Sequence, residues 1–144
     1  MKVCNIIDSV MGSGKTSWAI EYMNSQYDEN TLYIFCHGYF TPKEVYFLKK
    51  LSLIVSKECE FLHWGDMDFG GISIFMFIKD RIFEKLIPYR MGVADFEEAL
   101  KKDAGIPLKA STREKLQKKD AGLLTELKEA ILESDKTIEQ ERLL

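Results

Sequence analysis

Two aspartates separated by one residue, Asp66 and Asp68, follow an apolar run and precede Gly70 and Gly71. Where such a pair ends a β-strand, both carboxylates can point at one divalent cation, and Mg²⁺ prefers oxygen ligands of this kind. The glycines would let a phosphate group come close to the backbone. The spacing therefore predicts a Mg²⁺ site at Asp66 and Asp68, with both side chains taking part in catalysis at a phosphate group.

A structural role is the alternative for the same aspartates. Aspartate is favoured at helix N-termini, where its side chain accepts a hydrogen bond from a backbone N–H, and a helix is expected from Gly71. His63 precedes the pair, but a zinc site is not expected, because such sites draw on several cysteines and histidines. The chain has three cysteines and two histidines, with no CxxC pair.

A second cluster of chemically capable residues lies near the N-terminus, between an apolar strand and a predicted helix. It follows the pattern G-x-x-x-x-G-K-[ST], in which backbone N–H groups surround a phosphate, the lysine reaches the outer phosphates and the hydroxyl binds Mg²⁺. Ser9 stands where the first glycine of the pattern belongs. The segment resembles the Walker A region of helicase-type P-loop ATPases, which implies ATP as a ligand; the alternative is a Gly/Ser-rich turn that caps a helix. The nucleotide-binding residues would be Gly12, Ser13, Gly14, Lys15 and Thr16.

Composition narrows the class of protein. The chain has 144 residues, of which 46% are hydrophobic, and this is typical of one folded domain. No long uncharged apolar run is present, so we expect no membrane span. The odd number of cysteines without a CxxC pair favours a reducing cytoplasm. The net charge of −3 does not favour indiscriminate attraction to nucleic acid, so any DNA contact would need a local basic patch.

Hydrophobic periodicity supplies the elements that would position these residues. It predicts strands at 3–7, 31–36, 60–64 and 87–91, and helices at 15–24, from Thr41 and at 71–86. This alternation favours an α/β fold with a small parallel sheet flanked by helices, with ligands at the carboxyl ends of the strands. The helix that begins at Thr41 would bury one stripe of side chains: Val45, Phe47, Leu48 and Leu51.

The character of the sequence changes after residue 92. Helices are predicted at 93–102 and 121–132, with a third through 138–141, and no strand pattern is visible there. We interpret this part as a helical appendage packed on the sheet. The whole chain is expected to form one compact domain. Its three segments would be a P-loop-like strand-loop-helix unit at 1–30, an α/β core at 31–92 and the helical appendage at 93–144.

From about residue 31 to its end, the chain resembles the C-terminal Toprim-type domain of the JetD family of Wadjet anti-plasmid proteins. The resemblance rests on Gly38–Pro42, His63–Gly71, Ile87–Met91 and Glu139–Glu141, which occur in the family's order. It implies a Toprim-like sheet and Mg²⁺-dependent cleavage of DNA by a strand-end glutamate together with the aspartate pair. It also implies condensin-like defence subunits as partners. Glu139 and Glu141 match the family's terminal acidic motif.

The chain departs from that family at its first strand. The family's catalytic glutamate belongs there, but the phosphate-loop segment takes its place, and Asp8 at the end of the strand would be the nearest substitute. Two other readings therefore stay open. One is a small P-loop ATP-binding, helicase-like protein centred on Lys15 and Thr16. The other is an inactive fusion of two gene fragments that meet near Asn30.

The ATP-binding alternative predicts stabilisation of the protein by Mg²⁺-ATP. A ligand that binds only the folded state adds about 2.7 kcal/mol to the free energy of unfolding at about 100 times its Kd, so Tm should rise by several degrees. The Lys15→Ala variant should lose this shift, because the lysine would contact the phosphates. Thermal denaturation with and without ATP measures both, and an equal shift in the two proteins would contradict the phosphate-loop interpretation.

Overall fold

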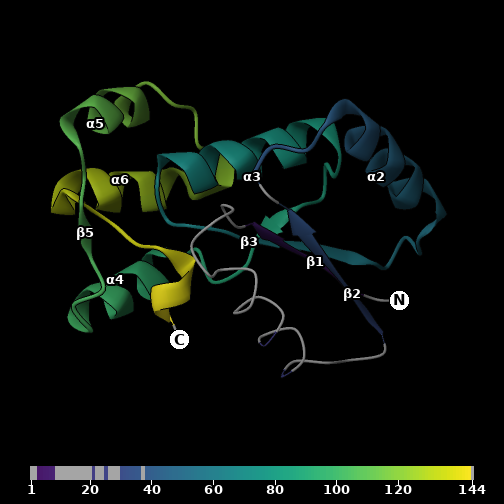
Figure 1. Cartoon of the computed structure of the whole chain (residues 1–144), viewed down its shortest axis with the longest axis horizontal. Helices are drawn as coiled ribbons and strands as arrows, with labels where there is room; N and C mark the ends of the chain where they lie inside the picture. The colour runs from purple at the N-terminus through teal and green to yellow at the C-terminus, as the bar shows by residue number, and fades with distance from the viewer. Residues whose placement is uncertain (1–2, 9–20, 22–24, 26–29, 37, 144) are drawn as a thin grey trace.

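A four-stranded parallel sheet forms one half of the molecule (Figure 1). The computed structural model describes residues 3–8, 21, 25, 30–36 and 38–143. The strands are β1 (Val3–Asp8), β2 (Thr31–Cys36), β3 (Glu60–Trp64) and β4 (Ile87–Pro88). They pair in the order β2-β1-β3-β4, and every pairing is parallel. The predicted small parallel sheet is thereby confirmed.

The edge strand β4 is shorter than the predicted 87–91. It ends at Pro88, two residues before Arg90, whose φ of 53° is left-handed. Because a left-handed residue turns the chain out of the extended conformation, the segment after Pro88 leaves the sheet. It still follows the end of β3, since the Tyr89 amide donates to the His63 carbonyl at 2.8 Å.

The predicted start of helix α2 (Pro42–Ile54) is confirmed by its cap. Thr41 is the N-cap and Pro42 the first helical residue, where the missing proline N–H costs nothing. The Thr41 amide donates to the Glu44 carboxylate at 2.7 Å, and the Glu44 amide donates to the Thr41 hydroxyl at 3.4 Å. This reciprocal capping box satisfies donors that the first turn would otherwise leave without partners.

The stripe predicted for α2 is wrong at Phe47. Leu48 is buried, and Val45 and Leu51 pack against the core, but Phe47 is 65% exposed. The reason is geometric, since successive helical residues point about 100° apart and Phe47 falls on the outer side when Leu48 faces the sheet. Tyr46 lies on the same outer side and is 62% exposed.

Helix α3 (Phe69–Arg81) is largely buried, as its apolar sequence predicts. Its Phe75 ring contacts His63 of β3, with 5.7 Å between the ring centroids. Phe83, which follows the end of the helix, stacks on Phe61 of β3 with 4.5 Å between the centroids. The helix ends earlier than the predicted 71–86. Its last turn is followed by a turn whose apolar side chains stay in the core: Ile82, Phe83 and Leu86.

Helices α2 and α3 lie on the same face of the sheet, above the strands in Figure 1. Residues at one register position in parallel strands point to one face, and β1 aligns Ile34 of β2 with His63 of β3. Ile34 lies in an apolar groove with Leu48 of α2, whereas His63 contacts Phe75 of α3. Trp64 therefore belongs to the opposite face.

The C-terminal part contains α4 (Val93–Lys101), α5 (Ala110–Gln117) and α6 (Thr125–Ser134), with short 3₁₀ turns η1 (Gly122–Leu124) and η2 (Gln140–Leu143). It also contains an antiparallel pair, β5 (Ile106–Pro107) and β6 (Lys136–Thr137), so the expectation of no strands after residue 92 is wrong. A two-residue strand is too short to show periodicity. Helix α5 was not predicted either, because Leu116 is its one buried residue.

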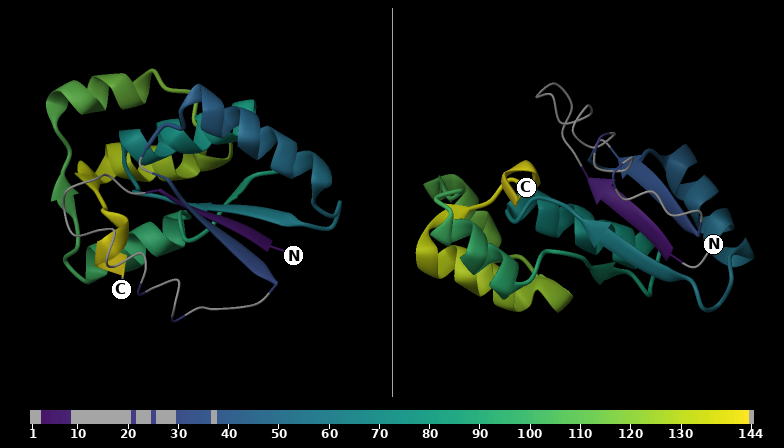
Figure 2. Two further views of the ribbon diagram at one scale, coloured as in Figure 1. Left: turned by 45° about the vertical axis from the view of Figure 1, so that its right-hand side comes forward. Right: turned by 90° about the horizontal axis from the view of Figure 1, so that it is seen from below.

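This C-terminal part packs into the same core as the sheet (Figure 2). Buried side chains of α3 such as Phe75 and Ile78 form one cluster with Phe96, Leu127 and Ile131 of the helical part. The expectation of helices packed on the α/β core is consistent with this cluster. No helix in the described part of the chain is both long and apolar enough to cross a membrane.

His63 lies in this core in its neutral form. The side chain is fully buried, and neither ring nitrogen has a hydrogen-bond partner in the described structure. Burial lowers the pKa of His63 from its ordinary 6.5 to about 3, because the charged imidazolium would lose its hydration. The predicted packed strand histidine, rather than a metal ligand, is therefore consistent with the structure.

The pH dependence of stability follows from this pKa. Since the unfolded chain takes up the proton near pH 6.5 and the folded chain only near pH 3, stability should fall as pH drops from 6.5 toward 3. At pH 5 the loss due to His63 should be about 2 kcal/mol. Urea unfolding at pH 7.5 and pH 5 measures it, and His63→Leu should lack this part of the loss. An identical pH dependence in both proteins would show that His63 is not the cause.

Candidate metal site at the end of strand β3

The turn that follows β3 carries both predicted aspartates. Met67, between them, is fully buried and forms an antiparallel bridge with Ile138, in which each amide donates to the other residue's carbonyl, at 2.8 and 3.1 Å. Neighbours of an inward-pointing residue in extended backbone point the other way. Asp66 and Asp68 therefore lie on the outer side of the turn, and both are half-buried.

Asp68 is the N-cap of α3, as the structural alternative predicted. Its Oδ1 accepts a hydrogen bond from the Gly71 amide at 2.7 Å, and its backbone is extended. A carboxylate offers several lone pairs on two oxygens, so one capping bond does not preclude a metal bond. The cap fixes the side chain at the helix N-terminus, where the helix dipole also stabilises its negative charge.

Asp66 is held by the C-terminal segment. Its Oδ1 accepts a hydrogen bond from the amide of Gln140 at 2.8 Å. Gln140 is itself buried, and its side-chain amide donates to the Trp64 carbonyl at 3.4 Å. Residue 140 thus joins the acidic turn across 74 positions of sequence. Nothing in the sequence assigned a role to Gln140, although it lies between Glu139 and Glu141, which were singled out as a terminal acidic motif.

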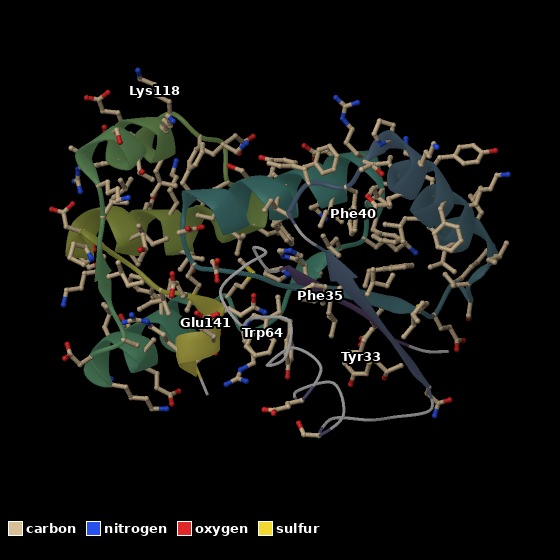
Figure 3. The ribbon with its side chains drawn as sticks, viewed as in Figure 1. Tyr33, Phe35, Phe40, Trp64, Lys118 and Glu141 are labelled. Atoms are coloured by element: carbon tan, nitrogen blue, oxygen red, sulfur yellow. The ribbon has the colours of Figure 1, made fainter. Side chains whose placement is uncertain are left out.

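The two glutamates lie close to the turn but in different settings. Glu139 lines a cavity of about 210 Å³ together with Asp68, Lys109 and Thr112. It also pairs with Arg142, with 3.8 Å between Oε2 and Nε. Glu141, which Figure 3 labels, is half-buried and belongs to the C-terminal turn η2. The terminal acidic motif is therefore brought to the predicted site, with Glu139 on the Asp68 side.

Asp8 ends β1, the strand beside β3. In the parallel register Ile7 lies opposite Trp64, so the backbone of Asp8 comes level with the start of the turn that carries Asp66. The side chain of Asp8 lies outside the described part of the chain. So do the proposed nucleotide-binding residues Gly12, Ser13, Gly14, Lys15 and Thr16.

The donor set suits Mg²⁺ in kind. Mg²⁺ is held through one or two carboxylates plus waters and substrate phosphates, and Asp66 and Asp68 supply two carboxylates from one turn. Among the described residues no group of three or more His, Cys, Asp and Glu is placed to hold a metal ion. Within the part of the chain whose side chains are described, a Mg²⁺ ion here would therefore depend on the aspartate pair.

The glycines also have a structural role, which differs between the two positions. A Cβ on Gly71 would lie 1.8 Å from the carbonyl oxygen of Asp66, so this glycine lets the first turn of α3 pack on its own acidic turn. A Cβ on Gly70 would meet Oδ1 of Asp68 at 3.2 Å. A contact within the chain thus requires glycine at position 71, whereas the approach of a phosphate to the two glycines stays a prediction.

Comparison with known proteins gives two matches. Residues 19–144 match the family described as "Wadjet protein JetD, C-terminal". The chain is also 33% identical, over 132 residues, to the Wadjet protein JetD of Bacillus cereus (strain Q1). The aligned region covers 85% of this chain and 32% of that protein. The chain thus spans about a third of the length of the curated relative it matches. The family match begins earlier than the resemblance from about residue 31 and leaves out the loop at 12–16.

The two glycines give a matched test of the turn. Gly71→Ala should destabilise the fold by more than about 2 kcal/mol, because the new Cβ must displace the Asp66 carbonyl. Gly70→Ala should change stability by less than about 1 kcal/mol, since its neighbour is a side-chain oxygen and alanine favours the helix. Urea unfolding compares them, and equal effects would contradict the described packing of the turn.

Proposed function

This chain belongs to the family of the C-terminal region of the Wadjet protein JetD, and we propose that it is a Toprim-type, Mg²⁺-dependent DNA-cleaving domain. Asp66 and Asp68 hold the ion in this proposal. The family membership supports the general assignment. The order of the strands supports the proposed chemistry, because it brings the backbones of Asp8 and Asp66 to the same edge of the sheet.

The observation that carries the proposal is the position of the aspartates in the sheet. From β1 the chain passes to β2 on one side, and from β3 it passes to β4 on the other, although β1 and β3 are adjacent. In open α/β sheets, ligands bind in the crevice that such a switch of direction opens at the carboxyl ends of the strands. Asp8 ends β1 and Asp66 follows β3, so both backbones reach this switch point.

The chain's own contacts prepare the two carboxylates for an ion. The Gln140 amide orients Asp66, and the Gly71 amide orients Asp68, so neither side chain must be ordered when a ligand arrives. Bound Mg²⁺ would neutralise charge on a phosphodiester and lower the pKa of a bound water. Asp8 is the candidate for the third carboxylate, and Glu139 and Glu141 flank the site.

DNA is the substrate in this proposal, and condensin-like defence subunits are the proposed partners. The described carboxylates repel a phosphate backbone, so Mg²⁺ bound between them and the phosphate should strengthen DNA binding at this site. ATP binding remains a separate prediction that depends on Lys15 and Thr16.

Nicking of supercoiled plasmid in the presence of Mg²⁺ or Mn²⁺ tests the proposal. Asp66→Asn keeps the acceptor for the Gln140 amide but removes the charge, and it should lower the nicking rate by about 100-fold or more. Asp8→Asn should also lower the rate if this residue supplies the third carboxylate. Asp80→Asn, at an exposed position on α3, is the matched control and should retain the full rate.

Two results would contradict the proposal. The first is a nicking rate of the Asp66→Asn protein equal to that of the Asp80→Asn protein. The second is nicking that continues undiminished in EDTA. Metal binding measured directly, by Mn²⁺ titration, should weaken in Asp66→Asn and stay unchanged in Asp80→Asn.

A further inference from the structure

A half-buried arginine, Arg90, lies beside the acidic turn. Its guanidinium carbon lies over the indole of Trp64, 5.0 Å from the ring centroid. The next residue, Met91, accepts a hydrogen bond from the Gly65 amide through its sulfur, at 3.3 Å. Trp64 and Gly65 immediately precede Asp66. These contacts attach the arginine to the end of β3 from which the aspartates project.

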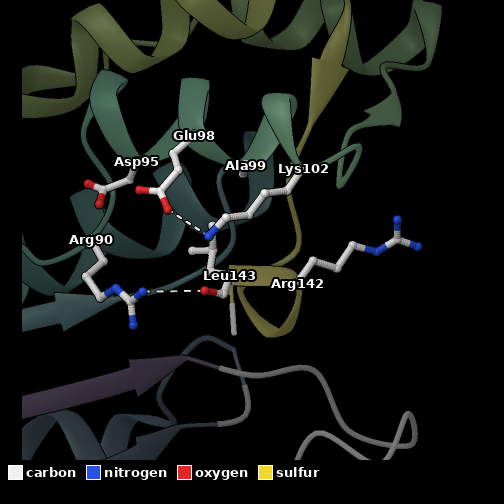
Figure 4. Close-up of a pocket in the computed structure, with 7 residues that line it drawn as sticks. All are labelled: Arg90, Asp95, Glu98, Ala99, Lys102, Arg142 and Leu143. Carbon is white, nitrogen blue, oxygen red and sulfur yellow. Dashed lines mark hydrogen bonds and ion pairs between the residues drawn. The ribbon is translucent and has the colours of Figure 1, made fainter.

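The guanidinium has little else to bind within the described structure. Its one hydrogen bond to a described residue is long, 3.4 Å from Nη2 to the carbonyl of Leu143 (Figure 4). The acidic residues nearby have other partners, since Glu98 pairs with Lys102 at 2.7 Å and Asp95 accepts from the Gly92 amide at 3.0 Å. Arginine presents several N–H donors in one plane. Most of those of Arg90 meet no acceptor among the described residues.

The backbone of Arg90 is also unusual. Its φ of 53° is left-handed, a conformation that costs energy for a long side chain and that Asn or Gly adopts more readily. Such residues persist where the surrounding structure fixes them, and they cluster at functional sites. Here the strand end and the stacking on Trp64 hold the side chain in one place.

The hollow that Arg90 lines is small. It measures about 20 Å³ and is bordered by α4 and by the C-terminal turn η2. Sites for small molecules measure about 300–1,000 Å³, so an enclosed ligand does not fit. A ligand of Arg90 would instead pass over the surface, as a polymer backbone does.

We propose that Arg90 binds a phosphate of the DNA strand that enters the Asp66–Asp68 site, an inference that rests on the proposed function. The planar guanidinium matches the geometry of a phosphodiester and can stack on an aromatic ring at the same time. Trp64 holds one face of the guanidinium, and the N–H groups at its edge bind the phosphate. Arg90 is thus a substrate-binding residue next to the carboxylates.

Salt-dependent DNA binding in EDTA tests this inference apart from metal chemistry. The probe is a fluorescent duplex of about 20 base pairs, and binding to the full chain is measured by anisotropy over a range of NaCl concentrations. Arg90→Asn removes the charge and suits the left-handed backbone. It should weaken binding about 5- to 10-fold near 0.1 M salt and reduce the slope of log K against log salt by about 0.9.

Two further variants separate a phosphate contact from a structural role. Arg90→Lys keeps the charge, so it should retain the slope while it binds more weakly than the native protein. Lys118→Asn removes a charge from an exposed position beyond α5, far from Trp64 in Figure 3, and should leave binding and slope nearly unchanged. Thermal denaturation of each variant shows which of them are folded at the assay temperature.

Equal binding by Arg90→Asn and Lys118→Asn overturns the inference, and so does a loss of slope in Arg90→Lys. Failure of the native protein to bind the duplex in EDTA overturns this inference, and failure to bind it in Mg²⁺ as well overturns the proposed function too. If the Arg90 effects appear but Asp66→Asn still nicks plasmid, the metal role of the aspartates fails while the phosphate contact stands.

Discussion

The backbone bridge between Met67 and Ile138 is the constraint on which the acidic turn depends. It fixes the residue between the two aspartates to a segment that comes 71 positions later. With Met67 held inward, Asp66 and Asp68 both face outward, and the same C-terminal segment brings the Gln140 amide to Asp66. A turn of this kind would otherwise have many conformations, and its ordering would reduce the affinity for an ion.

Each aspartate has a structural role beside the chemical role that we propose for it. Asp68 caps α3, and Gly71 allows that helix to start directly against the Asp66 carbonyl. These contacts restrict the carboxylates to defined positions before any ligand binds. The cost is that substitutions in the turn affect folding as well as chemistry. For this reason Asn, which keeps one acceptor oxygen, is a better probe than Ala at either position.

Charge around the site is distributed unevenly. The carboxylates of Asp66 and Asp68 follow the end of β3, with Glu139 on the Asp68 side, whereas Arg90 lies on the Trp64 side of the same strand end. Lys102 and Arg142 near Arg90 are paired with glutamates. A nucleic-acid backbone that crossed this edge of the sheet would contact the Arg90 guanidinium beside the carboxylates. Attraction to a local cation of this kind does not require a basic chain, and the net charge here is −3.

Local sequence determined the elements that depend on neighbours along the chain. The strands at 31–36 and 60–64, the Thr41–Pro42 cap and the buried character of α3 follow from periodicity and capping chemistry. Local sequence also predicted that Asp66 and Asp68 form a candidate site, and that an aspartate caps the helix that follows them. Phe47 was misplaced because two faces of α2 are apolar, and sequence alone does not show which of them packs on the sheet.

Only the tertiary structure decided the features that depend on contacts between segments far apart in the sequence. The β5–β6 pair has too few residues to leave a pattern, and Gln140 contacts Asp66 through a backbone amide that every non-proline residue carries. Arg90 likewise looks ordinary until its backbone and Trp64 are seen together. The residue types of a segment predict its local conformation. Contacts between distant segments depend instead on how those segments are packed together, and the packing of the whole core fixes that arrangement.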